Sequence, residues 1–316
     1  MNLLILEPGE VSESGDVLLT DARAGHVLNV LKAAPGHDVR VGLLDGPRGV
    51  GTVQAADEGA VRLRCSFSTD VPPKPRVDLL LALPRPKVMR RLWAQLAALG
   101  VGRIMLTNAA RVERNYFDTH VLSADCYRPL LVEGLQQAKD TRLPEVSIHK
   151  QLKVLVEDQL DHLFDGGGRI VADPASEVPP GVVARRHAGA RLLLAVGPEG
   201  GWNAFELALL KAHGFESAGM GPRTLRTDTA CVALLSLVSE TEREGCEAAR
   251  DAGGSPREGC EPARDAGVPP REGCEAARGA GGSPREGCEA ARGAGVPASA
   301  ATGAGRGAPA TNNGSQ

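Results

Sequence analysis

The chain of 316 residues has no apolar run that approaches the roughly 20 residues needed to cross a membrane. Its start, Met1-Asn2-Leu3, has neither the basic segment nor the cleavage site of a secretory signal. These absences predict a soluble protein in the reducing environment of the cytoplasm.

Large apolar residues are also missing from the C-terminal part. From Arg243 onward, variants of the 14-residue unit Arg-Glu-Gly-Cys-Glu-Ala-Ala-Arg-Asp-Ala-Gly-Gly-Ser-Pro occupy 243–256, 257–270, 271–284 and 285–298. Val268 and Val296 are the only large apolar residues there, so burial cannot offset the conformational entropy lost on ordering. We expect residues 243–316 to be disordered, with at most transient helix in each Cys-Glu-Ala-Ala-Arg stretch.

Cysteine spacing argues against a zinc site. Four of the seven cysteines belong to the repeat, with no Cys-x-x-Cys pair and no histidine among them. We therefore expect no metal. The other three cysteines, Cys65, Cys126 and Cys231, are interpreted as small buried hydrophobic residues.

An excess of positive charge is absent as well. Residues 1–242 contain 27 basic and 29 acidic side chains, and the repeat region has nine arginines against ten acidic residues. RNA-binding proteins are usually basic overall. Any RNA contact must therefore come from a local patch rather than from the field of the whole molecule.

The remaining chain shows two different patterns. Residues 1–70 contain short strand-like runs separated by Gly, Asp and Pro, with a helical stretch from about Ala22 to Lys32, and this pattern fits a small β-barrel. A Pro-rich linker occupies 71–76. Alternating strands and helices in 77–242 predict a parallel sheet with helices on both faces. We expect strands at 77–83, 103–107, 169–172 and 191–196, and helices at 87–99 and from about 227 to 240.

Two loops in this second part carry the strongest functional signal. The first, Gly197-Pro198-Glu199-Gly200-Gly201, follows the apolar run 192–196, and the second, Gly-Pro-Arg-Thr-Leu-Arg-Thr-Asp-Thr-Ala at 221–230, precedes another apolar run. An apolar run that stops at Gly-Pro predicts a buried strand ending in a tight turn. Open α/β sheets bind ligands at the carboxyl ends of such strands. No strand-linked Gly-x-Gly-x-x-Gly and no P-loop motif competes with this site.

In wording, order and spacing, the two loops resemble those of the SPOUT class of RNA methyltransferases, and in particular the family that methylates N3 of uracil in 16S ribosomal RNA. The likeness covers about residues 1–242. It also includes Leu-Ala-Leu-Pro-Arg-Pro-Lys at 81–87, Arg-Val-Glu-Arg-Asn-Tyr-Phe at 111–117, Glu-Gly-Leu-Gln-Gln-Ala at 133–138 and Arg-Leu-Pro-Glu at 142–145.

The resemblance implies an α/β fold with a PUA-like RNA-binding β-barrel at 1–70 and a SPOUT methyltransferase domain at 77–242. The C-terminal segment of that domain would thread a loop and form a trefoil knot. The resemblance also implies a homodimer, because SPOUT sites are completed by a second chain, and the apolar final helix is the expected interface. The implied cofactor is S-adenosylmethionine, and the implied partner is 16S ribosomal RNA in the small subunit.

Carried over to this sequence, the resemblance also assigns site residues. Cofactor contacts are expected from Pro174, Gly197, Gly201, Met220, Gly221, Leu225, Arg226 and Ala230, and RNA contacts from His26, Arg85, Lys87, Arg111, Arg114 and Arg142. Arg226 is the candidate for holding the base or a phosphate, because a guanidinium donates two parallel hydrogen bonds. Glu199 is the candidate for orienting the ligand or accepting a proton. A structural arginine, a turn-stabilising carboxylate and a solvated charged face are the alternatives for these groups.

Two other functions are compatible with the sequence. The same fold can methylate a different RNA nucleotide, because no single residue here dictates uracil. A non-catalytic RNA-binding or ribosome assembly factor is the rival from another class, although the intact glycines of both loops argue against it. A third possibility gives the function to the repeat region as a tether, and deletion of 243–316 distinguishes this from a catalytic core.

Overall fold

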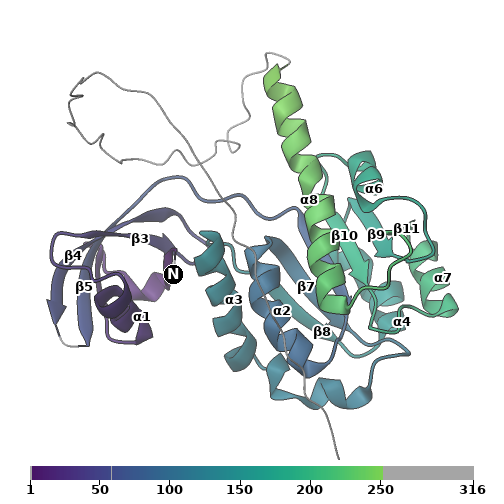
Figure 1. Ribbon diagram of the computed structural model, residues 1–316, viewed down its shortest axis with the longest axis horizontal. Coiled ribbons are helices and arrows are strands. Elements are labelled where there is room, and N and C mark those ends of the chain that lie inside the picture. Colours follow the sequence, from purple (N-terminus) through teal and green to yellow (C-terminus); the bar gives the residue numbers. More distant parts are fainter. Residues whose placement is uncertain (1, 58, 252–316) are drawn as a thin grey trace, which may run out of the picture. The chain divides into compact units, whose positions relative to one another are not determined.

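Two β-sheets carry the fold in the computed structural model, which describes residues 2–57 and 59–251 (Figure 1). The N-terminal sheet has the strand order β1-β3-β4-β5-β2, with β1 parallel to β3 and the other pairs antiparallel. Its strands are β1 (Leu4–Leu6), β2 (Asp16–Leu19), β3 (Asp38–Leu43), β4 (Arg48–Asp57) and β5 (Ala60–Phe67). Because β1 and β2 are its two edges, the predicted barrel is present as a curled half-barrel sheet.

The second sheet has six strands in the order β11-β9-β10-β6-β7-β8, and every neighbouring pair is parallel. Its strands are β6 (Val77–Ala82), β7 (Val101–Thr107), β8 (Glu145–His149), β9 (Gly168–Ala172), β10 (Leu192–Val196) and β11 (Phe215–Ala218). The four predicted strands are confirmed. The sequence did not indicate β8 and β11, because these two edge strands are short and mix polar with apolar residues.

Helices follow each strand of the parallel sheet, and a further one lies between β2 and β3 of the half-barrel sheet. They are α1 (Ala22–Gly25), α2 (Pro86–Ala98), α3 (Ala124–Ala138), α4 (Leu152–Val154), α5 (Leu160–Leu163), α6 (Pro180–Arg186), α7 (Ala204–Ala212) and α8 (Thr227–Asp251). Contacts of α2 with α3, of α2 with α8 and of α6 with α8 place these four helices in one layer, while α7 packs on β11. Within residues 2–57 and 59–251, no helix has the length and apolar composition of a membrane span.

The last helix is longer than predicted. We expected it to end near Glu240, but α8 continues to Asp251, so residues 243–251 of the first repeat are helical rather than disordered. From Thr227 to Asp251 the only helix breaker is Gly245, and the first strong break signal is the Gly-Gly-Ser-Pro at 253–256. The rest of the segment predicted to be disordered, 252–316, lies outside the described residues.

Each sheet has its own hydrophobic core, and the N-terminal strand contributes to both. Leu4 and Leu6 belong to the smaller core of the half-barrel, whereas Leu3 and Ile5 belong to the larger core around β6, β7 and β10. This division follows from the two-residue period of a strand, whose side chains alternate between its faces.

The buried cysteines are confirmed with one exception. Cys65 and Cys231 are buried, and burial raises the pKa of the Cys65 thiol to about 11. Cys126 is only half-buried, contrary to the prediction. It lies in the first turn of α3, away from the stripe formed by Leu131 and Leu135 that is buried in the core.

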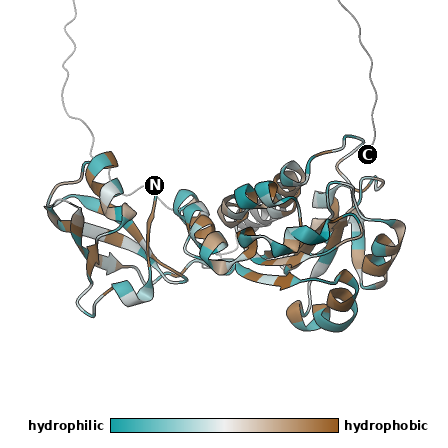
Figure 2. Ribbon diagram, turned by 90° about the horizontal axis from the view of Figure 1, so that it is seen from below, coloured by the Kyte–Doolittle hydropathy of each residue, from teal (hydrophilic) through white to brown (hydrophobic). Residues whose placement is uncertain are grey.

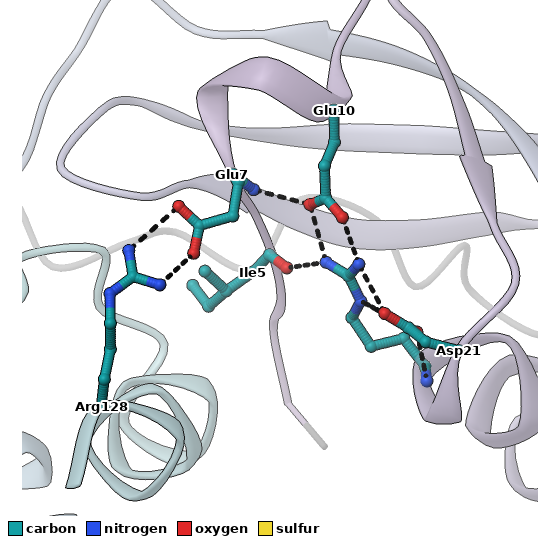
Figure 3. Close-up of polar contacts among 6 residues, drawn as sticks. Ile5, Glu7, Glu10, Asp21 and Arg128 are labelled. Carbon is teal, nitrogen blue, oxygen red and sulfur yellow. Dashed lines mark hydrogen bonds and ion pairs between the residues drawn. The ribbon is translucent and has the colours of Figure 1, made fainter. Parts of the chain in front are cut away.

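Charged contacts tie the residues after β1 to α1 and α3 (Figure 3). The Arg128 guanidinium of α3 donates to both carboxylate oxygens of Glu7, at 2.7 and 3.2 Å. The Arg23 guanidinium binds the carboxylates of Glu10 and Asp21 and donates to the Ile5 carbonyl at 2.9 Å. Hydrogen bonds from Arg23 lower the pKa values of both carboxyl groups.

Candidate active site

The carboxyl ends of three neighbouring strands, β9, β10 and β11, converge on a pocket of about 260 Å³. It is lined by Ala172, Asp173 and Pro174 after β9, by residues 196–202 after β10, and by Ala218–Gly221, Arg223–Leu225 and Thr227 after β11, with Ala230 and Leu234 of α8. The two loops that the sequence singled out therefore share one pocket. The strand order explains why they meet. The chain passes from β10 to β11 across β9, and such a reversal leaves a crevice at the carboxyl ends of the strands.

Glycines allow these loops to approach one another. A Cβ at Gly219 would lie 2.0 Å from the Ser176 carbonyl oxygen, so only glycine fits between the loops after β9 and β11. Two residues later Gly221 has a φ of 87°, a conformation that disfavours other residues. At these two positions the wall of the pocket is bare backbone, which offers hydrogen-bonding groups to a ligand.

Two buried polar groups border the pocket. The Asp173 carboxylate is 7% exposed and accepts hydrogen bonds from the Ser217 hydroxyl at 3.2 Å and from the Ala175 N–H at 3.0 Å. The Trp202 indole is also 7% exposed, and its buried Nε1–H has no hydrogen-bond partner in the described part of the chain. Because an unpaired buried donor is costly, the indole N–H marks a place where a ligand acceptor would be stabilising.

Exposed basic residues follow β6 and β7, the next two strands of the sheet beside β10. Arg85 precedes the first turn of α2, which contains Lys87, and both follow β6. Arg111 and Arg114 lie in the segment after β7. The carboxyl ends of parallel strands share one edge of a sheet, so these four cations lie at the same edge of the sheet as the pocket.

The sequence comparisons place this site in a family. Residues 72–239 match the model of an RNA methyltransferase domain. The ribosomal RNA small subunit methyltransferase E of Treponema pallidum (strain Nichols) is 30% identical over 244 residues, which cover 75% of this chain and 90% of the relative. The chain belongs to this RNA methyltransferase family.

Two further similar proteins match nearly over their whole length but cover only about three quarters of this chain. The protein of the same name from Mycobacterium bovis is 28% identical over 250 residues, covering 75% of this chain and 95% of the relative. A ribosomal RNA small subunit methyltransferase E from Neisseria gonorrhoeae, whose structure is bound to S-adenosyl methionine, superimposes with a TM-score of 0.62 at 19% identity. That alignment covers 76% of this chain and 97% of the other, so the two chains share their fold over most of the length of each.

The structure places most of the cofactor residues that family resemblance assigned around the pocket. Its lining contains Pro174, Gly197, Gly201, Met220, Gly221, Leu225 and Ala230, together with Glu199. Arg226 is not part of the lining. Its side chain is exposed, and its carbonyl accepts the Ala230 N–H at 2.8 Å.

Two of the expected RNA-binding residues have different surroundings. The Arg142 guanidinium donates to the carbonyls of Pro72 at 2.5 Å and Asp45 at 3.0 Å, so it holds backbone segments together. His26 lies after α1 beside a separate cavity of about 570 Å³, and its Nε2 is buried without a partner in the described residues. Burial lowers the pKa of the His26 imidazole. The RNA-binding roles of both residues stay predictions.

Sequence reasoning missed two residues at this edge. Trp202 follows the glycine loop directly, but its unpaired N–H depends on what packs around it. Glu206 forms a capping box with Asn203 at the start of α7, which is a local arrangement. Its further hydrogen bond, from the Ala110 N–H, joins residues 96 positions apart and leaves no local signal.

Proposed function

We propose that this chain uses S-adenosylmethionine to methylate N3 of a uridine in 16S ribosomal RNA of the small subunit. The observation that carries the proposal is the pocket formed by three loops at the sheet edge that also carries the four exposed cations. Family membership supports the reaction class, and the names of the relatives support the substrate.

The pocket residues fit this cofactor. When bound, S-adenosylmethionine supplies an electrophilic methyl group on a sulfonium. The backbone around Gly197, Met220 and Gly221 would bind its adenosine, with Pro174, Leu225 and Ala230 against its apolar parts. The unpaired Trp202 N–H offers a hydrogen bond to one of its acceptors, and this orphaned donor is the structural sign that the pocket takes a polar ligand.

Arg226 and Glu199 are proposed to act on the RNA base. No hydrogen bond or ion pair of the Arg226 guanidinium occurs within residues 2–57 and 59–251, so it is free to bind the uracil or a phosphate. Such a contact would stabilise negative charge that develops on the base as the N3 proton leaves. Glu199 is exposed on the pocket lining, where its carboxylate would orient the base or take that proton. Most of the rate enhancement would come from positioning the two reactants.

The finer architecture belongs to the same proposal. We infer a PUA-like barrel at 1–70, a linker at 71–76 and a SPOUT domain at 77–242 whose C-terminal segment forms a trefoil knot. We also infer a homodimer, and α8 supports it, since Leu237 is 39% exposed on that helix. RNA contacts are assigned to Arg85, Lys87, Arg111 and Arg114, with His26 and Arg142 as further candidates.

The decisive experiment is methyl transfer from labelled S-adenosylmethionine to small ribosomal subunits that lack the modification, followed by nucleoside analysis of the RNA. We expect the label in 3-methyluridine. Label in another nucleoside would replace the substrate but keep the reaction class. No label, together with no cofactor binding by calorimetry, would leave a non-catalytic RNA-binding or assembly factor.

A further inference from the structure

Glu206 lies outside the pocket lining. It nevertheless joins the loop after β10, which lines the pocket, to the loop after β7, which carries Arg111 and Arg114. We propose that Glu206 is a positioning residue that couples the cofactor loop (residues 197–203) to the arginine loop (residues 108–114). This inference rests on the proposed function, because the ligands of the two loops are taken from it.

The geometry of the Glu206 carboxylate carries the proposal. The side chain is buried, with the residue 5% exposed, and each of its oxygens accepts one backbone hydrogen bond. Oε2 accepts the Asn203 N–H at 2.8 Å, and Oε1 accepts the Ala110 N–H at 2.6 Å. In return the Glu206 N–H donates to Oδ1 of Asn203 at 2.8 Å.

A helix cap accounts for only half of this arrangement. The capping box of α7 needs the reciprocal bonds between Asn203 and Glu206, which are local. The bond to Ala110 adds nothing to the helix, but it pairs a buried carboxylate oxygen with an amide in another loop. Loss of that bond would leave a buried charge partly unsatisfied, so the two loops are held together by a strong constraint.

A second contact joins the same two loops. The Arg111 guanidinium donates to the Gly200 carbonyl, and a Cβ at Gly200 would lie 2.7 Å from Cδ of Arg111. The loops are therefore linked at two points, one buried and one exposed. A displacement of one loop must move the other or break both links.

Ligand coupling follows from this linkage. A cofactor that orders residues 197–203 would also order residues 108–114, which carry Arg111 and Arg114 toward the RNA. By reciprocity, RNA bound at the arginine loop would raise the affinity for the cofactor by the same factor. Glu206 thus makes methyl-donor binding and RNA binding favour one another.

The test compares Glu206→Ala with Asn203→Ala in the full chain. Asn203→Ala weakens the same helix start but keeps the Glu206–Ala110 bond, so it is the matched control. Amide hydrogen exchange is measured at Ala110 with and without S-adenosylmethionine. We expect the cofactor to slow this exchange about fivefold or more in the unmodified chain and in Asn203→Ala. In Glu206→Ala, Ala110 should exchange faster without ligand and respond little to the cofactor.

Kinetics supply a second readout. Glu206→Ala should raise KM for RNA and weaken the mutual enhancement of RNA and cofactor binding, whereas Asn203→Ala should leave both within about twofold. If Glu206→Ala does not fold, Glu206→Gln carries the test, because it keeps the volume and one acceptor. Equal exchange and equal KM in the two variants would overturn the proposal. Cofactor binding without methyl transfer in the unmodified chain would overturn only the proposed reaction, whereas no cofactor binding would overturn both.

Discussion

The Trp202 indole shows how one side chain can prepare a pocket for a ligand. Its Cδ1–Nε1 edge packs against Gly197, where an added Cβ would lie 3.2 Å from both atoms. The ring is therefore fixed beside the first glycine of the loop, with its N–H buried and unpaired.

Removal of this donor should weaken cofactor binding without unfolding the site. We expect Trp202→Phe to raise Kd for S-adenosylmethionine about fivefold, because one hydrogen bond contributes about 1 kcal/mol. Isothermal titration calorimetry measures the change. Trp93→Phe is the control, since the Trp93 N–H already donates to the Val121 carbonyl at 3.2 Å and does not line the pocket. An unchanged Kd in Trp202→Phe would contradict the role.

Arg226 is assigned to the RNA base rather than to the cofactor, because it lies in the loop but not on the pocket lining. We expect Arg226→Ala to lower kcat by about 10² to 10³, the usual cost of removing one group that stabilises charge in a transition state. Kd for S-adenosylmethionine should stay within about twofold. Arg226→Lys should recover only part of the rate, because an ammonium cannot form two parallel hydrogen bonds. An equal loss of cofactor affinity would return Arg226 to a cofactor-binding role.

The helices α2 and α3 are in close contact at a glycine of α3. A Cβ on Gly134 of α3 would lie 2.1 Å from the Ala94 carbonyl oxygen and 3.0 Å from Cβ of Ala97, both on α2. The helices can therefore pack in this register only when residue 134 has no side chain.

We expect Gly134→Ala to lower the free energy of unfolding by about 1 to 3 kcal/mol, because the backbones must move apart. Gly181→Ala on α6 is the matched control, since its nearest contact, the Leu237 carbonyl oxygen at 3.5 Å, is ordinary packing. The control should be neutral or slightly stabilising through helix propensity. Urea unfolding of both variants measures the difference, and equal stabilities would contradict the close approach.

The ion pairs around α1 predict a pH dependence for the half-barrel sheet. The hydrogen bond from Arg23 lowers the folded-state pKa of Glu10 below its ordinary value of 4.5. A lowered carboxyl pKa stabilises the fold above the unfolded pKa, and this stabilisation is lost as the pH falls through the folded pKa. Urea unfolding of the chain and of Glu10→Gln should therefore differ at pH 7, and the difference should shrink below pH 4.5 and vanish once the pH has fallen through the lowered pKa of Glu10. A difference that persists at acid pH would point to packing rather than charge.

On the scale of the whole molecule, a slightly acidic chain must bind an anionic polymer. Residues 1–242 have two more acidic than basic side chains, so attraction to RNA depends on the edge that carries Arg85, Lys87, Arg111 and Arg114. At the amino ends of the same strands, two arginines bind other groups of the protein. There the Arg76 guanidinium donates to the carbonyls of Ala190 and His187, and Arg191 pairs with the buried Asp78.

A local patch of four cations predicts a limited salt dependence. The logarithm of the RNA association constant should fall with the logarithm of salt concentration at a slope of about −3, if each cation neutralises one phosphate. Arg114→Ala should reduce the magnitude of the slope by about one, and so should Arg85→Ala. Fluorescence anisotropy with a labelled RNA fragment measures these slopes. A slope that neither variant changes would place the RNA elsewhere on the molecule.

Local patterns in the sequence determined four of the six parallel strands, the helices α2 and α8 and the two pocket loops, but not the short edge strands β8 and β11. Apolar runs such as 192–196 end at glycine and proline, so each strand and its turn are encoded within a few residues. The resemblance of the loop sequences to those of a known family added the roles of the loops. The same local patterns did not predict the full length of α8. The helix continues into the first repeat without a strong break signal at the boundary, so its end could not be placed from the sequence.

Only the tertiary structure decided which distant groups meet. It brought the loops after β9, β10 and β11 into one pocket through strand order, engaged Arg142 with two carbonyls, and left the Trp202 N–H buried without a partner. It also gave the Glu206 carboxylate a second amide, from Ala110, in addition to its helix cap. Chain segments far apart leave no periodic trace of their contacts, so these pairings depend on how the strands are ordered and packed. The sequence by itself determined the local parts of the site, and the fold determined how they are joined.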